Sequence, residues 1–581
     1  MFKQQIQNLV YSALKSLAKK GVFSQITLEK KSIEIETQFQ KEKGDYSSNI
    51  AFSLAKQLKQ SPQAIAQKIQ EEILIKKPKF LKKIEEKNGF LNFFLEENIL
   101  TSKFLKVESE KLFSLNIGKN QKVIIEFSSP NIAKPMHVGH LRSTIIGDCL
   151  ANLFSFSGYQ VIRWNYLGDW GTQFGKLITA YKLWGKEEKI KKDPVNNLLN
   201  LYQRFHSEAK KNPQLEKMAQ EEFKKLEDGD KENTRLFQWF SKESSKEFQK
   251  IYRLFKIKFD VIKGESFFYQ DQEKIIDELK KKKIVQESEG ALIIDLKEFN
   301  LPPALILKSD EAGLYLTRDL CALIYRVDKY QPKMILYVVG NEQDLHFRQL
   351  FAIFQKIRKN KVKLVHVKFG LVLNEKKEKF STREGELIPL KELIDKAIIE
   401  ALKILNKKQP AWSKEKKQKI AEKIAISSLK FNNLKTHRLN DIIFDWERMM
   451  SFQGDSSVYL QYTSARFSKI LAKSKLSRNF IKDFQKRNQK IEINSLEKDI
   501  IKKIIDWPDI IISSVRNYAP NILANYLLSL ADLLNQYYET TPVLQEENLK
   551  TRHFRLYLIE ICLEVFTNGF NLLGIETLKE I

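Results

Sequence analysis

The sequence predicts an α/β fold in which a doubly wound parallel sheet is preceded by a small α/β domain and followed by an all-helical domain. The first observation is a short, apolar, β-branched run from Val123 to Phe127 that leads through a polar turn into a helical pattern. A second run, Val161 to Leu167, ends in the glycine-rich turn GDWGTQFG, as the next βα unit of such a sheet would. Beyond Pro389, apolar residues recur almost wholly at helical spacing.

Length and charge limit the classes of protein to consider. The 581 residues are enough for about three domains. Lys plus Arg number 99 and Asp plus Glu 72, so the formal net charge of +27 favours a polyanionic partner such as a nucleic acid. Lysine is abundant throughout the chain, so a compositional bias is an alternative explanation of the same charge.

Cysteine usage and hydropathy bear on the compartment. Cys149, Cys321 and Cys562 lie too far apart for a disulfide framework or a cysteine-based zinc site, which favours a reducing compartment. No apolar run approaches the roughly 18 residues of a membrane span, so we expect no membrane partner. The basic, amphipathic N-terminus could be a transit peptide, but it lacks arginine and its apolar residues continue into the next segment. We therefore expect an ordinary first helix and a cytoplasmic protein.

The sequence pattern of residues 1 to about 115 predicts the small α/β domain. The stretch GDYSSNIAFSLAKQL, from Gly44 to Leu58, reads as a turn followed by an amphipathic helix. The next helix begins with a capping serine, Ser61, and a proline at its first position. NGFLNFFL, from Asn88 to Leu95, reads as a strand.

The turn after the Val123 strand has the features of a phosphate site. A strand that runs through a tight turn into a helix directs free N–H groups and the positive end of the helix dipole at an anion. His137 and His140 lie three residues apart, on one face of this helix, and would add N–H donors. Gly139 between them allows a base or ribose to approach the backbone. A zinc site is the weaker interpretation, because metalloprotease helices space their histidines four apart around a glutamate.

These residues resemble a known family. HVGH, from His137 to His140, resembles the HIGH signature of class I aminoacyl-tRNA synthetases, and the longer string SSPNIAKPMHVGHLRST is similar to its arginyl-tRNA synthetase version. The resemblance implies a Rossmann-like catalytic domain that binds ATP. It also implies an N-terminal domain that contacts the tRNA, although a domain without RNA contact is an alternative, and a helical anticodon-binding domain. The expected domains are 1–115 (N-terminal, tRNA-contacting), 116–390 (catalytic, with a charged helical insertion at about 182–258), 391–455 (helices contacting the tRNA stem) and 456–581 (anticodon-binding).

The same resemblance implies an arginine site. Chemistry agrees with the assignment, since a guanidinium needs a planar acceptor and Asp319 can accept two parallel hydrogen bonds. Tyr315, four residues earlier, can offer a flat face or a hydroxyl, while Gln343 and Asn131 can bind the substrate's carboxylate and amine. Taken singly, each acid would more often be a solvated surface charge, so the assignment depends on the set as a whole. The expected arginine-binding residues are Glu126, Ser128, Asn131, Glu265, Tyr315, Asp319 and Gln343.

A second class I signature falls in a charged loop. KFSTR, from Lys379 to Arg383, resembles KMSKS, although Thr382 stands where the second lysine is expected. Arginyl enzymes that lack this lysine often carry one just before the histidines, and Lys134 matches it. The expected catalytic residues are His137, His140, Lys134, Lys379 and Arg383, and those that bind ATP are His137, Gly139, His140, Lys379 and Ser381. From composition alone, the loop also reads as a solvated basic hairpin.

Together these features predict arginine–tRNA ligation. The predicted partners are ATP with Mg²⁺ but no protein metal site, L-arginine and tRNA(Arg), and we expect a monomer. No nucleophile–base pair occurs in the motif stretch, so no covalent enzyme intermediate is expected. One rival is a class I ligase for another amino acid, which would not need the Tyr315, Asp319 and Gln343 set. The other is a non-catalytic RNA-binding relative, which would be expected to have lost the histidines or the substrate acids.

Overall fold

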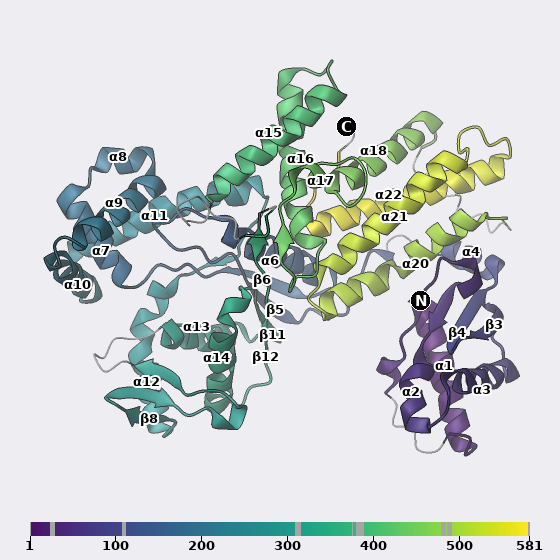
Figure 1. The fold of residues 1–581 in the computed structure, drawn as a ribbon, viewed down its shortest axis with the longest axis horizontal. Coiled ribbons are helices and arrows are strands. Elements are labelled where there is room, and N and C mark those ends of the chain that lie inside the picture. The colour runs from purple at the N-terminus through teal and green to yellow at the C-terminus, as the bar shows by residue number, and fades with distance from the viewer. Residues whose placement is uncertain are drawn as a thin grey trace.

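A computed structural model describes residues 2–23, 29–106, 112–307, 315–374, 376–378, 388–477, 484 and 491–578. It divides into an N-terminal α/β domain, a central parallel sheet with a helical insertion, and a C-terminal helical region (Figure 1). Figure 1 shows the N-terminal domain beneath the C-terminal helices and beside α20.

The N-terminal domain is a four-stranded antiparallel sheet, ordered β1-β2-β4-β3, with helices packed against it. Ser61 caps the third helix as predicted, because its side chain accepts a hydrogen bond from the Ala64 backbone N–H at 3.2 Å. The prediction of a turn was wrong at Tyr46–Ser48, which forms a three-residue strand that is too short to show an alternating pattern and is buried throughout. The elements are α1 (Phe2–Lys19), β1 (Glu36–Thr37), β2 (Tyr46–Ser48), α2 (Ile50–Leu58), α3 (Pro62–Ile75), β3 (Leu81–Lys87), β4 (Phe90–Leu95) and α4 (Glu97–Lys106).

The central sheet has five parallel strands in the order β12-β11-β5-β6-β7. The chain leaves β5 towards β6 on one side and later returns to β11 on the other, which confirms the predicted doubly wound topology. The strand order therefore reverses between β5 and β11, the position at which such sheets bind ligands at the carboxyl ends of their strands. The strands and flanking helices are β5 (Lys122–Glu126), α6 (Val138–Phe156), β6 (Gln160–Asn165), β7 (Val261–Ile262), α13 (Tyr315–Tyr330), β11 (Met334–Tyr337), α14 (Asp344–Ile357) and β12 (Lys363–His366).

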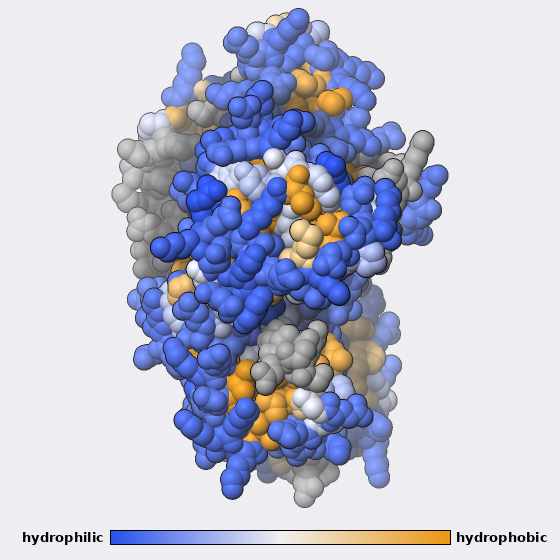
Figure 2. Space-filling model, turned by 90° about the vertical axis from the view of Figure 1, so that its left-hand side faces the viewer, coloured by the Kyte–Doolittle hydropathy of each residue, from blue (hydrophilic) through white to orange (hydrophobic). Residues whose placement is uncertain are grey.

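Two insertions interrupt this sheet. Helices from α7 to α11 lie between β6 and β7, and an antiparallel meander, β8-β9-β10, lies between β7 and α13. The apolar faces of the inserted helices are buried, and the face of the molecule seen in Figure 2 is mostly hydrophilic with small separate hydrophobic patches. The inserted elements are α7 (Thr172–Trp184), α8 (Glu187–Lys192), α9 (Pro194–Ala209), α10 (Gln214–Glu227), α11 (Lys231–Leu254), α12 (Gln272–Lys281), β8 (Val285–Ser288), β9 (Ala291–Ile294) and β10 (Ala304–Leu307).

The C-terminal region is helical apart from β14 (Ile442–Ile443), which pairs with β13 (Val372–Leu373). Helix α22 is long and apolar enough to cross a membrane by length and composition, so the prediction that no stretch approaches that length was wrong. However, 78% of its apolar window is buried inside the structure, as in a core helix. The helices are α15 (Leu390–Lys408), α16 (Lys414–Leu434), α17 (Trp446–Met449), α18 (Ser457–Ser474), α20 (Ser495–Arg516), α21 (Pro520–Thr540) and α22 (Leu549–Leu573).

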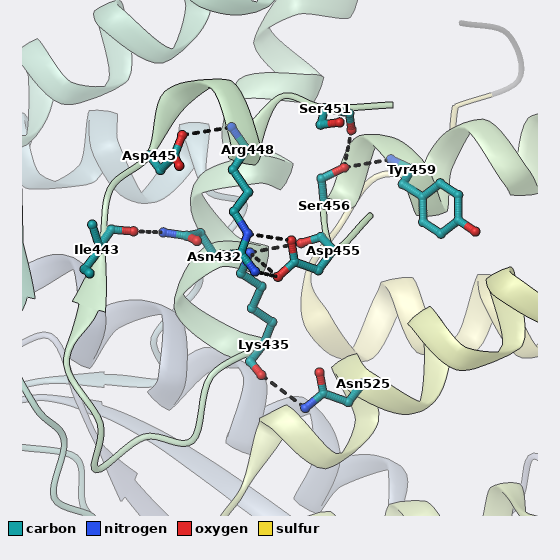
Figure 3. A network of polar contacts seen from close by, with 10 residues as sticks. All are labelled: Asn432, Lys435, Ile443, Asp445, Arg448, Ser451, Asp455, Ser456, Tyr459 and Asn525. Carbon is teal, nitrogen blue, oxygen red and sulfur yellow. Dashed lines mark hydrogen bonds and ion pairs between the residues drawn. The ribbon is translucent and has the colours of Figure 1, made fainter. Parts of the chain in front are cut away.

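A polar junction joins the end of α16 to α17, α18 and α21 (Figure 3). Asp455 lies at its centre and accepts hydrogen bonds from Arg448 at 2.9 and 2.8 Å and from Lys435 at 3.1 Å. The Lys435 carbonyl in turn accepts a hydrogen bond from Asn525 of α21 at 3.2 Å. Ser456 caps α18 by accepting from the Tyr459 N–H at 3.0 Å. These bonds fix the turn between two helical layers.

Candidate active site

A cavity of about 470 Å³ opens at the carboxyl ends of β5 and β11, where the strand order reverses. Nine of the residues singled out in the sequence line its wall. They come from the last residue of β5 and the turn after it, the first turn of α6, the segment after β7, helix α13 and the turn before α14. They are Glu126, Ser128, Asn131, Gly139, His140, Glu265, Tyr315, Asp319 and Gln343.

The two histidines cap the start of α6. His137 is the N-cap, and its Nδ1 accepts the Gly139 N–H at 3.1 Å, while His140 Nδ1 accepts the His137 N–H at 3.2 Å. With Nδ1 an acceptor in both rings, each neutral imidazole carries its proton on Nε2 and can donate from there. The ring centroids lie 3.9 Å apart, although only His140 belongs to the cavity wall.

Both imidazoles remain neutral around pH 7. Burial and the neighbouring His137 lower the pKa of His140 to about 3. Burial and the charge of Lys134 lower the pKa of His137. The helix start therefore offers uncharged N–H donors and its dipole to an anion.

Two close contacts place the turn between β5 and α6. A Cβ on Gly147 of α6 would lie 2.2 Å from the Phe127 side chain, so glycine lets this helix approach the end of β5. A Cβ on Gly168 would lie 2.0 Å from Asn131 Oδ1, so glycine leaves room for that amide in the cavity wall. Ser128, with φ of 75°, holds a left-handed backbone between them, which is strain of the kind found at functional sites.

Acidic side chains form the opposite wall. Asp319 is 7% exposed, and its Oδ2 lies 2.7 Å from His346 Nε2. Its Oδ1 is buried and accepts no hydrogen bond from any residue that the structure describes. The negative charge of Asp319, followed by burial, raises the pKa of Tyr315, whose hydroxyl therefore stays protonated.

Two further acids are paired with arginines. Glu265 Oε2 accepts from Arg318 Nε at 2.8 Å, and burial nevertheless raises the pKa of Glu265 to about 7. Glu126 lies 2.5 Å from Arg326, which is 1% exposed, and burial raises the pKa of Glu126. Since one carboxylate here is half protonated near pH 7, the cavity can gain negative charge when a cation enters.

The cationic residues predicted for the phosphates lie elsewhere or outside the described residues. Lys134 is not part of the cavity wall; its ammonium lies 5.3 Å from the centre of the Tyr202 ring in the insertion. Lys379, Ser381 and Arg383 fall outside the described residues. The segment that follows their loop is anchored beside the histidines, because Val138 N–H donates to the Ile388 carbonyl at 3.1 Å and Leu390 N–H to the Met136 carbonyl at 2.8 Å.

Comparison with known protein families shows which family the chain matches. Residues 102–446 match the family model described as tRNA synthetases class I (R), catalytic domain. Residues 4–95 match the arginyl tRNA synthetase N terminal domain, and residues 460–581 match the DALR anticodon binding domain. The chain belongs to the arginyl-tRNA synthetase family.

Relatives extend this likeness over almost the whole length. The arginine–tRNA ligase of Clostridium kluyveri is 39% identical over 575 residues, which cover 97% of this chain and 99% of that protein. The arginine–tRNA ligase of Streptococcus pneumoniae is 41% identical over 549 residues, covering 93% and 94%. The crystal structure of the arginyl-tRNA synthetase from Plasmodium falciparum superposes with a TM-score of 0.83 at 26% identity and covers 100% of this chain and 99% of that one. The Thermus thermophilus structure, at 22% identity, shares the fold with a TM-score of 0.80.

Several residues in or next to this arginyl-tRNA synthetase-type cavity were missed in the sequence. Arg326 lies seven residues after Asp319 on α13, so helical spacing could have placed it on the same face. His346 follows Gln343 by three residues at the start of α14 and could have been found in the same way. Tyr166 follows the end of β6 and carries no comparable signal. Within the described residues, no group of three or more His, Cys, Asp or Glu side chains could hold a metal ion.

Proposed function

We infer that the chain is an arginine–tRNA ligase that activates L-arginine with ATP and transfers it to tRNA(Arg). The observation that carries this conclusion is the pairing, in one cavity of a chain of this family, of an acidic wall around Asp319 with the neutral imidazole of His140 at a helix start. The acidic wall suits a guanidinium, and the helix start suits phosphate oxygens.

In the first step, the arginine carboxylate attacks the α-phosphorus of ATP, and pyrophosphate leaves. Catalysis at phosphorus depends mostly on positioning and on stabilising charge. His140 donates from Nε2 to phosphate oxygens, and His137 lies beside it with its ring plane inclined by 39°. Because both rings are neutral, they stabilise the developing charge by hydrogen bonding and do not transfer a proton. Mg²⁺ enters with ATP as part of the substrate.

The arginine side chain points at the acidic wall. Asp319 Oδ1 accepts one guanidinium N–H, which satisfies a buried oxygen that otherwise has no donor among the described residues. Glu265 supplies the second acid, and Tyr315 lies against the guanidinium plane. Asn131 and Gln343, on opposite sides of the sheet's switch point, bind the α-amine and carboxylate, while Glu126 and Ser128 complete the base of the cavity.

The loop with Lys379, Ser381 and Arg383 closes over the β- and γ-phosphates, and Lys134 shares the cationic role. Support for this role comes from the described residues that follow in the sequence, since Ile388 and Leu390 bond to the backbone beside His137. In the second step, a ribose hydroxyl at the 3′ end of the tRNA attacks the arginyl carbonyl and releases AMP.

The tRNA contacts are proposed from the domain order. Residues 1–115 contact the tRNA, 391–455 contact its stem and 456–581 bind the anticodon, while 116–390 perform the chemistry with an insertion at about 182–258. The net charge of +27 suits this polyanionic partner. The protein acts as a monomer in the cytoplasm, away from membranes.

Charging of total tRNA with each labelled amino acid in turn, in the presence of ATP and Mg²⁺, tests the proposal. We expect arginine alone to be attached. Attachment of another amino acid would overturn the substrate assignment, and tRNA binding without ATP turnover would overturn the activity itself.

A further inference from the structure

An imidazole lies behind the acid that receives the guanidinium. His346 belongs to the first turn of α14, and its Nε2 lies 2.7 Å from Asp319 Oδ2 on α13. His346 is not part of the cavity wall, whereas Asp319 is. The imidazole therefore touches the substrate acid from outside the lining of the cavity.

This contact leaves the two oxygens of Asp319 with different tasks. An ionised carboxylate only accepts hydrogen bonds, so His346 donates through Nε2–H and holds Oδ2 in place. Oδ1, in contrast, is buried and receives no donor from the described part of the chain. A ligand N–H would satisfy it, and with Oδ2 fixed, the direction from which that N–H must come is fixed as well.

The same ring packs on a second residue of the proposed arginine site. The centroid of the His346 ring lies 5.0 Å from that of Tyr315, with the planes inclined by 39°, and 5.3 Å from that of Phe347 in an edge-on contact. One imidazole thus supports both the acid and the aromatic face that would surround a guanidinium.

A donor that carries no permanent charge is chemically suited to this place. Lysine or arginine would bind Asp319 as a counter-ion and cancel the charge that attracts the substrate. The other acids in the cavity wall already have such counter-ions, Arg318 for Glu265 and Arg326 for Glu126. Asp319 has a histidine instead.

We propose that His346 is a positioning residue for arginine recognition, which orients Asp319 and Tyr315 without touching the substrate. This inference rests on the proposed function, because it assumes that a guanidinium enters the cavity. It assigns to His346 a share of the arginine affinity and none of the chemistry at phosphorus.

Two variants separate the donor from the ring. His346→Phe keeps an aromatic ring beside Tyr315 but removes the N–H, and His346→Gln keeps an N–H but removes the ring. A hydrogen bond to a charged group is worth enough for His346→Phe to raise the KM for arginine about tenfold or more. We expect the KM for ATP and kcat at saturating arginine to stay close to wild type, and His346→Gln to recover arginine KM to within about threefold.

A double-mutant cycle keeps the test decisive if His346→Phe folds poorly. In an Asp319→Asn background, His346→Phe should raise the arginine KM much less than it does in the wild-type protein, because there is no longer a carboxylate for the N–H to orient. An unchanged arginine KM in His346→Phe, or equal losses for arginine and ATP with a lowered Tm, would overturn the proposal. Failure of the wild-type protein to charge tRNA with arginine would refute the proposed function instead, before any variant is compared.

Discussion

Asp319 in the cavity and Asp455 at the junction of α16, α17 and α18 are both held by nitrogen donors, yet they are satisfied to different extents. Asp455 uses both oxygens, which accept from Arg448 and Lys435 (Figure 3). Asp319 uses only Oδ2, and its buried Oδ1 has no donor among the residues described. The cavity also contains the hydroxyl of Tyr166, which likewise has no hydrogen-bond partner in the part of the chain that the structure describes.

This difference in hydrogen bonding indicates which acid binds a ligand and which one stabilises the fold. A buried polar atom without a partner costs folding free energy, so it is tolerated where a ligand supplies the missing bond. A fully paired polar group has nothing to offer a ligand and serves the fold. Substitutions in the two regions should therefore move different quantities, and the following predictions are ordered by the size of the expected effect.

Replacing the acid at the centre of the cavity should have the largest effect on activity. Asp319→Asn should lower kcat/KM for arginine about a thousandfold, because it removes the charge of a buried ion pair with the substrate. The Tm should stay equal or rise, since an incompletely satisfied buried carboxylate is lost. Steady-state charging and thermal unfolding measure the two quantities. A large drop in Tm would show that Asp319, like Asp455, mainly stabilises the fold.

Loss of the buried imidazole donor should have the next largest effect. His140→Ala should slow arginine-dependent ATP–pyrophosphate exchange, measured with tRNA present, about a hundredfold, as removal of one preorganised donor does elsewhere. Because the pKa of His140 is about 3, the ratio of variant to wild-type rates should not change between about pH 6 and pH 9. tRNA binding should persist, and the exposed His437→Ala serves as the matched control. A ratio that varies with pH would contradict the neutral-donor role.

Glu265 should give arginine binding a pH dependence. Its pKa in the free protein is about 7, and a bound guanidinium favours the ionised form, so binding releases a proton. Affinity should therefore fall as the pH drops below 7, by up to about tenfold per unit. Calorimetric titrations across this range in two buffers measure the affinity and the proton released. Glu265→Gln should flatten the dependence, and an unaltered dependence in that variant would assign it to another group.

The junction should respond in stability alone. Burial opposes ionisation of Asp455, but the hydrogen bond from Arg448 and the charge of Lys435 outweigh it and lower the pKa of Asp455. Asp455→Asn should cost about 1 kcal/mol of unfolding free energy or less, because Arg448 is largely exposed and solvent screens the pair. The KM values for arginine and ATP should be unchanged. A change in arginine KM would show that the two regions are coupled.

The fold could be predicted because its signals are local. The strand from Val123 and the helix from Val138 each show their period within a few residues, so the βα unit follows from the sequence. The three-residue strand at Tyr46–Ser48 was missed because it is too short for a period. Helix α22 shows the converse, since its composition alone does not distinguish a buried core helix from a membrane span.

The candidate site was likewise predictable only in part. Residue types and family spacing selected the members of the cavity wall, but their pairing depends on contacts that no local pattern encodes. His346 reaches Asp319 across 27 positions, and Arg318 reaches Glu265 across 53. Glu126 ends strand β5, and its partner Arg326 lies on helix α13. These pairings decide which acid remains open to a ligand.

Equilibrium binding of arginine and citrulline, compared by calorimetry on the wild-type protein, tests the central claim most directly. The two amino acids have nearly the same shape, but citrulline carries a neutral urea in place of the guanidinium. If Asp319 Oδ1 and Glu265 receive a guanidinium, arginine should bind at least about a hundredfold more tightly, since citrulline forms no ion pair with either acid. Equal affinities would contradict the account, because the acidic wall would then not select its ligand by charge.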